Sequence, residues 1–265
     1  MLYYLAMSIF SVFGQYRELL NQLTMREIKQ RYKQSVLGYA WVILNPFFTM
    51  LVMAFVFSII MRIPDLGVPY PIYLYAGLLP WTLFANSLTS SANALVGNAG
   101  LLSKIYFPRE IFVLSTILAK IVDFLLSCSI FVIFMIYYQV PLSWNVLWVI
   151  PIFLIQQIFT YGLSLFLAAA NLFYRDIQYL LGLILLIWMY LTPVIYATEF
   201  FPAKYQWIFK LNPMAVIINA YRKVILAQGV PNLQSLGIAL GVSVIILAIT
   251  YKLFKKAEGV FADIV

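Results

Sequence analysis

The sequence predicts an all-α polytopic membrane protein with six transmembrane helices, an N-terminal interfacial helix and external re-entrant helices. The first reason is composition, because 64% of the 265 residues are hydrophobic and only 10% are charged, whereas apolar residues including glycine make up about half of a soluble domain. So few charged side chains would not cover the surface that a soluble chain of this length shows to water. The other reasons are the lengths of the apolar stretches and the uneven placement of cations between them.

Six stretches are long enough to cross a membrane, which requires roughly 20 mostly apolar residues. Their even number places both ends of the chain on the same side. In chain order they cover residues 36–61, 70–96, 111–138, 146–173, 177–197 and 233–251. We find no internal repeat and no polar stretch long enough for a separate soluble domain. Residues 36–265 are therefore predicted to form one membrane domain, preceded by a cytoplasmic and interfacial segment over residues 1–35.

Lysine and arginine fall unevenly on the two sides of these spans. One set of connecting segments carries eleven of the 17 cations, the other carries five, and Lys120 lies inside the third span. Because cation-rich loops stay in the cytoplasm, both termini are predicted to be cytoplasmic. The eleven are Arg17, Arg26, Lys29, Arg31, Lys33, Lys104, Arg109, Arg175, Lys252, Lys255 and Lys256, and the five are Arg62, Lys204, Lys210, Arg222 and Lys223.

The segment before the first span has the pattern of a helix lying in the cytoplasmic interface. Over residues 13–34, Phe13, Tyr16, Leu20 and Leu23 recur at helical spacing. The opposite side carries polar and charged residues, which suits a helix lying at a membrane surface. The alternative is a solvated basic linker. The polar side consists of Gln15, Glu18, Gln22, Arg26 and Lys29.

Residues 198–230 are too many for a turn and too apolar for a solvated loop. Asn212-Pro213 supplies a cap followed by proline at the first helical position, so a short helix is predicted from there to about residue 227. Arg222 and Lys223 near its end, with Gly229 beyond, are typical of a helix C-terminus. At about fifteen residues this helix is too short to cross. We interpret the segment as a gate or rim on the external side, the alternative being a lid that merely covers helix ends.

Residues 97–110 join the second and third spans on the cytoplasmic side. Pro108 disfavours helical geometry at Phe107, so a short helix should end there before the third span begins. A short amphipathic element between two rigid spans could transmit a push from a cytoplasmic partner. An ordinary connecting loop fits these residues equally well.

Two polar features lie at membrane depth. Lys120 and Asp123 are three residues apart, so they share a helix face and can form an ion pair, the alternative being a proton or ion site. The second span ends in polar residues that should face protein or water rather than lipid. They could line a pore or hold helices together. These residues are Asn86, Ser87, Thr89, Ser90, Ser91 and Asn93.

Aromatic residues make up 17% of the chain, and those outside the interfacial belts need another explanation. Trp41, Phe48 and Phe55 lie seven residues apart on one face of the first span. Trp188, Tyr190 and Tyr196 crowd the fifth span. Aromatic faces stack on the CH-rich faces of sugars, so these rings could line a passage for a glycan. Packing in the bundle core is the alternative. The sixth span also contains Gly237-Ile-Ala-Leu-Gly241, which favours close contact with another helix.

The residue inventory disfavours several kinds of chemistry. The chain has no histidine, which removes the commonest general base and metal ligand, and its single cysteine, Cys128, can build neither an intrachain disulfide nor a zinc site alone. The nine acidic residues are scattered, which argues against a membrane enzyme. With no repeat, an ion-coupled secondary transporter is also disfavoured.

The chain also lacks a Gly-x-x-x-x-Gly-Lys-Ser/Thr motif, so ATP and Mg²⁺ would have to be bound and used on a partner protein. We expect no cofactor and no enzymatic activity on this chain. The net charge of +8 is explained by membrane topology rather than by nucleic-acid binding.

Several short motifs occur in the order typical of a known family. The ordered set spans most of the chain and is more specific than any single member. The motifs are Arg31-Tyr-Lys-Gln-Ser-Val-Leu-Gly38-Tyr-Ala-Trp41-Val-Ile-Leu-Asn45-Pro46, Gly77-Leu-Leu-Pro-Trp81, Phe107-Pro108-Arg109-Glu110-Ile111, Asn171-Leu-Phe-Tyr-Arg175-Asp176, Thr192-Pro193-Val-Ile-Tyr196 and Asn212-Pro213-Met214. In these motifs the sequence resembles the ABC-2 type permeases that export polysaccharides, and within them the O-antigen exporters of the Wzm kind.

That resemblance implies a homodimer of six-span subunits in the bacterial cytoplasmic membrane, with a continuous channel between the subunits. It implies two copies of a cytoplasmic P-loop ATPase, Wzt-like, as partners and a polysaccharide on a polyprenyl diphosphate carrier as substrate. The family's interfacial helix corresponds to residues 13–34, its ATPase-docking helix to 97–107 and its periplasmic gate helices to 198–227. Export of capsule, teichoic acid or a small hydrophobic compound stays open, because spans and gates do not encode which glycan passes.

The candidate site residues fall into three groups. The cations near the cytoplasmic mouth could meet the carrier diphosphate, because cations at the interface attract anionic head groups, or could act only as topology signals; these are Arg31 and Lys33. The candidate channel residues are Tyr39, Trp41, Phe48, Phe55, Trp188, Tyr190 and Tyr196. The candidate ATPase-coupling residues are Lys104, Phe107, Pro108, Arg109 and Glu110.

Overall fold

The computed structural model describes residues 14–32, 35–61, 67–102, 107–198, 202, 204 and 207–264, and the regular secondary structure in these ranges is helical. The α-helices are α2 (Arg17–Tyr32), α3 (Ala40–Ala54), α4 (Tyr70–Ala92), α5 (Ala99–Leu102), α6 (Glu110–Tyr137), α7 (Val149–Phe173), α8 (Ile177–Leu191), α9 (Trp207–Leu211), α10 (Pro213–Ile225), α11 (Leu233–Ala257) and α12 (Phe261–Ile264). A π-helix, η1 (Phe55–Ile60), continues α3, and short 3₁₀ turns are η2 (Val96–Asn98), η3 (Trp144–Trp148) and η6 (Glu258–Val260).

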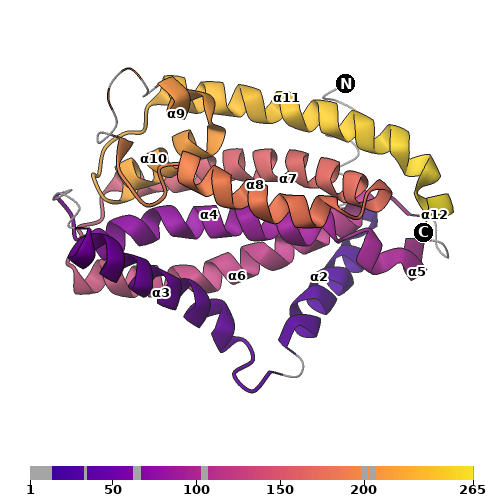
Figure 1. The fold of residues 1–265 in the computed structure, drawn as a ribbon, viewed down its shortest axis with the longest axis horizontal. Helices are drawn as coiled ribbons and strands as arrows, with labels where there is room; N and C mark the ends of the chain where they lie inside the picture. Colours follow the sequence, from indigo (N-terminus) through magenta and orange to yellow (C-terminus); the bar gives the residue numbers. More distant parts are fainter. Residues whose placement is uncertain are drawn as a thin grey trace.

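The helices α4, α6, α7, α8 and α11 run along the long axis of the molecule (Figure 1). Helix α4 is central, because it contacts α3, α6, α7, α8 and α10. The short helices α9 and α10 lie at one end of the bundle, and α5 and α12 lie at the other (Figure 1). The C-terminal end of α2 and the N-terminal end of α3 point away from the bundle and toward each other, so that the two helices form a V (Figure 1).

Four of the predicted spans correspond to helices long and apolar enough to cross a membrane. These are Ala40–Ile60, Glu110–Tyr137, Trp144–Phe173 and Leu233–Val260. The second predicted span is α4, whose 23 residues include all of the polar group near its end except Asn93, which caps the helix, and whose surface is largely buried by its neighbours. The helical class is therefore confirmed, while the count of six spans stays a prediction.

The fifth predicted span is shorter than expected. Helix α8 has only 15 residues and ends at Leu191, whereas the prediction extended to residue 197. Thr192 adopts an extended backbone, because the ring of Pro193 disfavours helical geometry in the residue before it. Residues 192–197 instead form a turn that packs into the bundle, with Val194 and Ile195 buried.

Local signals placed α10 correctly. The Asn212 side chain accepts a hydrogen bond from the Met214 backbone N–H, and Pro213 is the first helical residue. The helix ends at Ile225, two residues before the predicted end. Gln228, rather than Gly229, adopts the left-handed conformation, with φ of 51°.

Close approach between helices occurs at a glycine that the sequence analysis did not single out. A Cβ added to Gly162 on α7 would lie 3.0 Å from the Leu247 Cα on α11, so these two backbones nearly touch. Gly237 and Gly241 have no atom within 4 Å of an added Cβ. The close contact expected from the GxxxG motif is therefore not made among the residues that the structure describes.

The apolar residues of the N-terminal helix pack against other parts of the chain. Leu20 and Leu23 of α2 are buried in a cluster with residues of α6, and Tyr16 packs against the same cluster, whereas Phe13 lies outside the described residues. The position of α2 at a membrane surface stays a prediction. Between the second and third predicted spans, α5 ends at Leu102 and α6 begins at Glu110, directly after Pro108 and Arg109.

Candidate functional site

Helix α3 presents an exposed aromatic face. Trp41, Phe48 and Phe55 are 46%, 52% and 56% exposed, and Tyr39 just before the helix is exposed to a similar degree. Their seven-residue spacing keeps the three rings on one side of α3 and η1. They are thus available to something outside the protomer rather than used in its core.

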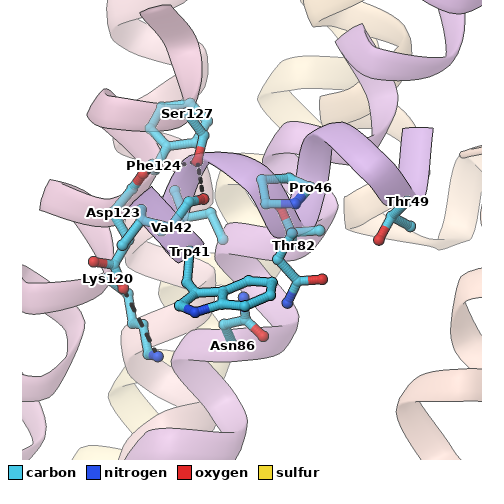
Figure 2. A pocket seen from close by; sticks show the side chains of 12 residues that line it. Trp41, Val42, Pro46, Thr49, Thr82, Asn86, Lys120, Asp123, Phe124 and Ser127 are labelled. Atoms are coloured by element: carbon cyan, nitrogen blue, oxygen red, sulfur yellow. Dashed lines mark hydrogen bonds and ion pairs between the residues drawn. The ribbon is translucent and has the colours of Figure 1, made fainter. Parts of the chain in front are cut away.

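A cavity of about 340 Å³ lies beside this face, between α3, α4 and α6. Figure 2 shows Trp41 extending across it, with Lys120 and Asp123 on the wall formed by α6 and Asn86 on the wall formed by α4. The lining is mostly polar, which is unusual for a site at membrane depth. It consists of Trp41, Val42, Asn45, Pro46, Thr49, Thr82, Leu83, Asn86, Lys120, Asp123, Phe124 and Ser127.

The ion pair predicted within the third span is present in this wall. The Lys120 ammonium lies 3.9 Å from the Asp123 carboxylate, and both side chains are mostly buried. Of the polar residues near the end of the second span, Asn86 lines the cavity, whereas Ser87 and Ser91 are buried inside the bundle. The prediction that these residues avoid lipid fits those three positions.

Pro46 shapes the wall formed by α3. Proline has no backbone N–H, so the Val42 carbonyl four residues earlier loses its usual helical donor. The Ser127 hydroxyl from α6 lies 3.2 Å from that carbonyl and 2.9 Å from the Asp123 carbonyl of its own helix, so its one proton is shared between these two acceptors. This contact joins α3 to α6 within the lining of the cavity (Figure 2).

The three candidates from the fifth span have different surroundings. Trp188 packs edge-on against Phe84 with ring centroids 5.2 Å apart, and its indole N–H donates to the Asn212 side chain at 3.2 Å. Tyr190 is exposed, and its carbonyl accepts a 2.6 Å hydrogen bond from the Tyr196 hydroxyl. For Trp188 the structure favours core packing, the alternative interpretation of these aromatics.

The turn after α8 is held to the bundle by a residue whose role the sequence analysis missed. Arg222 was predicted only as a cation at a helix end, but it is 5% exposed. Its guanidinium donates to the carbonyls of Pro193 and Val194, both at 2.5 Å, and to the Tyr73 carbonyl at 3.2 Å. The guanidinium carbon also lies 3.8 Å from the centre of the Tyr73 ring.

A signal for this role was present in the sequence. Arg222 lies eight residues after Met214 and four after Ile218, so it falls on the apolar face of α10, where a cation would otherwise be disfavoured. Gly77 on α4 makes room for it, because an added Cβ there would clash with the guanidinium. Arg222 thus joins α10, the turn after α8, and α4.

Two buried side-chain amides on α7, those of Gln156 and Asn171, form hydrogen bonds with neighbouring helices. The Gln156 side chain donates to the Pro80 carbonyl at 2.8 Å and accepts from the Tyr221 hydroxyl at 3.2 Å. Burial raises the pKa of Tyr221 above its ordinary range, so the hydroxyl keeps the proton it donates. The Asn171 side chain donates to the Ala92 carbonyl and accepts from the Gln178 N–H.

The candidate coupling residues that the structure describes pack against the C-terminal end of the chain. Phe107 is buried against Phe112, and Glu110 is 1% exposed. The Glu110 carboxylate lies 2.6 Å from the Lys255 ammonium, and the Arg109 backbone N–H donates to Glu258 at 2.8 Å. Lys104 lies outside the described residues.

The two proposed contacts with the carrier diphosphate stay predictions. Lys33 lies outside the described residues, and the side chain of Arg31 at the end of α2 is likewise not described. Across the part of the chain that the structure describes, no three His, Cys, Asp or Glu side chains come together so as to hold a metal ion.

The chain is similar in sequence to known membrane transport proteins. Residues 18–226 match the family described as ABC-2 type transporter. An O-antigen export system permease protein RfbA of Klebsiella pneumoniae is 35% identical over 250 residues, covering 93% of this chain and 95% of that protein. A protein of the same name in Myxococcus xanthus is 34% identical over 94% of this chain and 96% of its own length. A polysialic acid transport protein KpsM of Escherichia coli is 22% identical over 89% of this chain and 92% of its own length.

Proposed function

This chain belongs to the ABC-2 type transporter family, and on that premise we propose that it is the membrane subunit of an ATP-driven exporter of a polyprenyl-diphosphate-linked O-antigen. Relatives at 34–35% identity over nearly their whole length are O-antigen export system permeases. The proposed location is the bacterial inner membrane, with both termini in the cytoplasm. The chain would act as a homodimer whose facing surfaces enclose the passage.

The main observation that supports a passage for the glycan is the exposed aromatic face of α3, which lies beside a polar cavity. Irregular polar surface at membrane depth is tolerated only against protein or a water-filled space, so the wall containing Lys120, Asp123 and Asn86 should face an aqueous passage rather than lipid. Trp41 lines the same cavity, Phe48 and Phe55 continue the exposed side of the helix, and the three rings offer faces on which sugar rings can stack. Exposed aromatics of this kind let a glycan slide without tight hydrogen bonds.

The same proposal assigns roles to the two ends of the molecule. Residues 97–110 would receive the push of a cytoplasmic P-loop ATPase, present in two copies, which would bind the ATP and Mg²⁺. Arg31 and Lys33 would attract the carrier diphosphate at the cytoplasmic mouth. Residues 198–230, held by Arg222, would form the external gate.

The test compares two tryptophans. Trp41→Ala should reduce export of the glycan, whereas Trp144→Ala should not, because Trp144 is 88% exposed but lies on η3, away from the cavity lining. Export is measured as glycan reaching the cell surface, with lipid-linked glycan inside the cell as the complementary readout. Full export by Trp41→Ala would contradict the proposed passage.

A second candidate is export of an acidic capsule, favoured by the similarity to polysialic acid transport proteins. The lower identity of 22% makes it the weaker proposal. Deletion of the gene separates the two, because the glycan that accumulates on its lipid carrier inside the cell identifies the substrate. Co-purification of a P-loop ATPase with a carbohydrate-binding module would favour capped O-antigen.

A further inference from the structure

The C-terminal end of α11 meets the segment between the second and third predicted spans in a compact ionic cluster. Its members are the backbone N–H of Arg109, Glu110 at the start of α6, Lys255 in the last turns of α11, and Glu258 in η6. The two parts of the chain are about 145 residues apart in sequence. Only tertiary folding brings them together.

The distances make this cluster one connected unit. The Lys255 ammonium lies 2.6 Å from Glu110 and 3.0 Å from Glu258, so it bridges the two carboxylates. Glu258 uses its other oxygen to accept a 2.8 Å hydrogen bond from the Arg109 N–H. Because Glu110 is 1% exposed, its charge depends on this partner, since a buried carboxylate is tolerated only when it is paired.

Aromatic packing reinforces the same junction. Phe261 of α12 is fully buried, with its ring 5.2 Å from that of Phe254 on α11 and 6.2 Å from that of Phe173 on α7. Helix α12 also contacts α5, and the two lie at the same end of the molecule (Figure 1). The chain after Lys255 therefore folds back onto the segment that precedes α6.

We infer that Lys255 and Glu258 clamp the ATPase-facing segment to α11, so that α11 moves with this segment when the ATPase acts. Without the clamp, a push on residues 97–109 would reach the bundle mainly through the start of α6. With it, the push also reaches α11, which packs closely along α7 at Gly162 and Leu247. The role in transport rests on the proposed function, whereas the mechanical link does not.

The mechanical link is tested on the purified permease alone. Spin labels at Gly100→Cys on α5 and Lys256→Cys on α11, both exposed positions, are placed in a Cys128→Ala background and their distance distribution is measured. We expect a narrow distribution that broadens in Lys255→Met and in Glu258→Leu. Glu258→Gln should lie between its parent and Glu258→Leu, because its amide oxygen can still accept from the Arg109 N–H while its NH2 group cannot pair with the Lys255 ammonium. A distribution equally narrow in Lys255→Met and in its parent would overturn the clamp.

The role in transport is tested on the reconstituted complex with its ATPase. We expect Lys255→Met to keep the ATPase bound but to lower the glycan exported per ATP hydrolysed by about fivefold or more, the scale of a typical coupling energy. Lys256→Met, which removes an exposed cation next in sequence, should leave the ratio unchanged. A ratio equal to wild type in Lys255→Met would overturn the coupling role, whereas loss of fold would reduce ATPase binding and thermal stability as well.

The two proposals can fail separately. If the unmodified chain binds no ATPase and exports no glycan, the proposed function fails, and a narrow distance distribution that Lys255→Met broadens would still support the mechanical link. If export proceeds and the distribution does not respond to Lys255→Met or Glu258→Leu, the clamp is wrong and the proposed function stands.

Discussion

Replacing Arg222 with methionine should destabilise the protein far more than replacing its neighbour. Methionine fills similar space but leaves the carbonyls of Pro193, Val194 and Tyr73 without their guanidinium donor. A buried acceptor without a donor costs about 1–3 kcal/mol, and the contact with the Tyr73 ring adds about 0.5–2 kcal/mol. Hydrogen bonds between side chains in membrane bundles average nearer 0.6 kcal/mol. Taking the lower part of each range, we expect a loss of about 3 kcal/mol.

Lys223→Met is the matched control, because it removes the same charge from the same last turn of α10 at an exposed position. Its expected cost is the interaction with the helix dipole, about 0.3–1 kcal/mol. Arg222→Lys should be intermediate, since an ammonium cannot reproduce the planar fork of donors. The assay is thermal unfolding in detergent, in which Arg222→Met should unfold several degrees below Lys223→Met. Equal midpoints for these two variants would refute the stabilising role of the buried guanidinium.

Three further predictions follow from the packing. Gly162→Ala should destabilise relative to Gly241→Ala by about 1–3 kcal/mol in detergent unfolding, because both gain helix propensity but only the first forces α7 and α11 apart; equal stability would contradict the close approach. Lys120→Met and Asp123→Asn should each cost more alone than the two combined, as a double-mutant cycle of unfolding midpoints would detect, because each single change leaves a charge in the cavity wall. Asn171→Leu should lower stability by about 1–3 kcal/mol in detergent unfolding, because the Ala92 carbonyl and the Gln178 N–H lose their partner; an unchanged unfolding midpoint would contradict this role.

Local sequence signals predicted the features that depend on a few neighbouring residues. The Asn212-Pro213 start of α10 and the pairing of Lys120 with Asp123 both follow from spacings of one to three residues. The end of α8 at Leu191 was missed although Pro193 gave the same kind of signal, because the apolar run up to residue 197 continued past it. Apolar length predicts burial, and burial does not require a helix.

The features that were missed depend on contacts between distant parts of the chain. Arg222 meets carbonyls 28 and 29 residues away and a tyrosine 149 residues away. Gly162 matters because Leu247 lies opposite, whereas the GxxxG glycines have open space in front of them. Spacing along a helix identifies which residues share a face. It does not identify what that face will meet.

Aromatic content alone does not distinguish rings in the core from rings available to a substrate. The polar atoms near each ring make that distinction. The indole N–H of Trp188 is satisfied by Asn212 inside the protomer, and its ring is enclosed by Phe84 and other aromatics. Trp41 is half exposed beside a cavity whose wall carries an ion pair, at a depth where lipid would penalise both charges. Trp41 lines the same cavity as this ion pair, so its ring faces the same surroundings as the two charges. The proposed glycan contacts therefore belong to α3 rather than to Trp188, and export should be far less sensitive to Trp188→Phe than to Trp41→Ala.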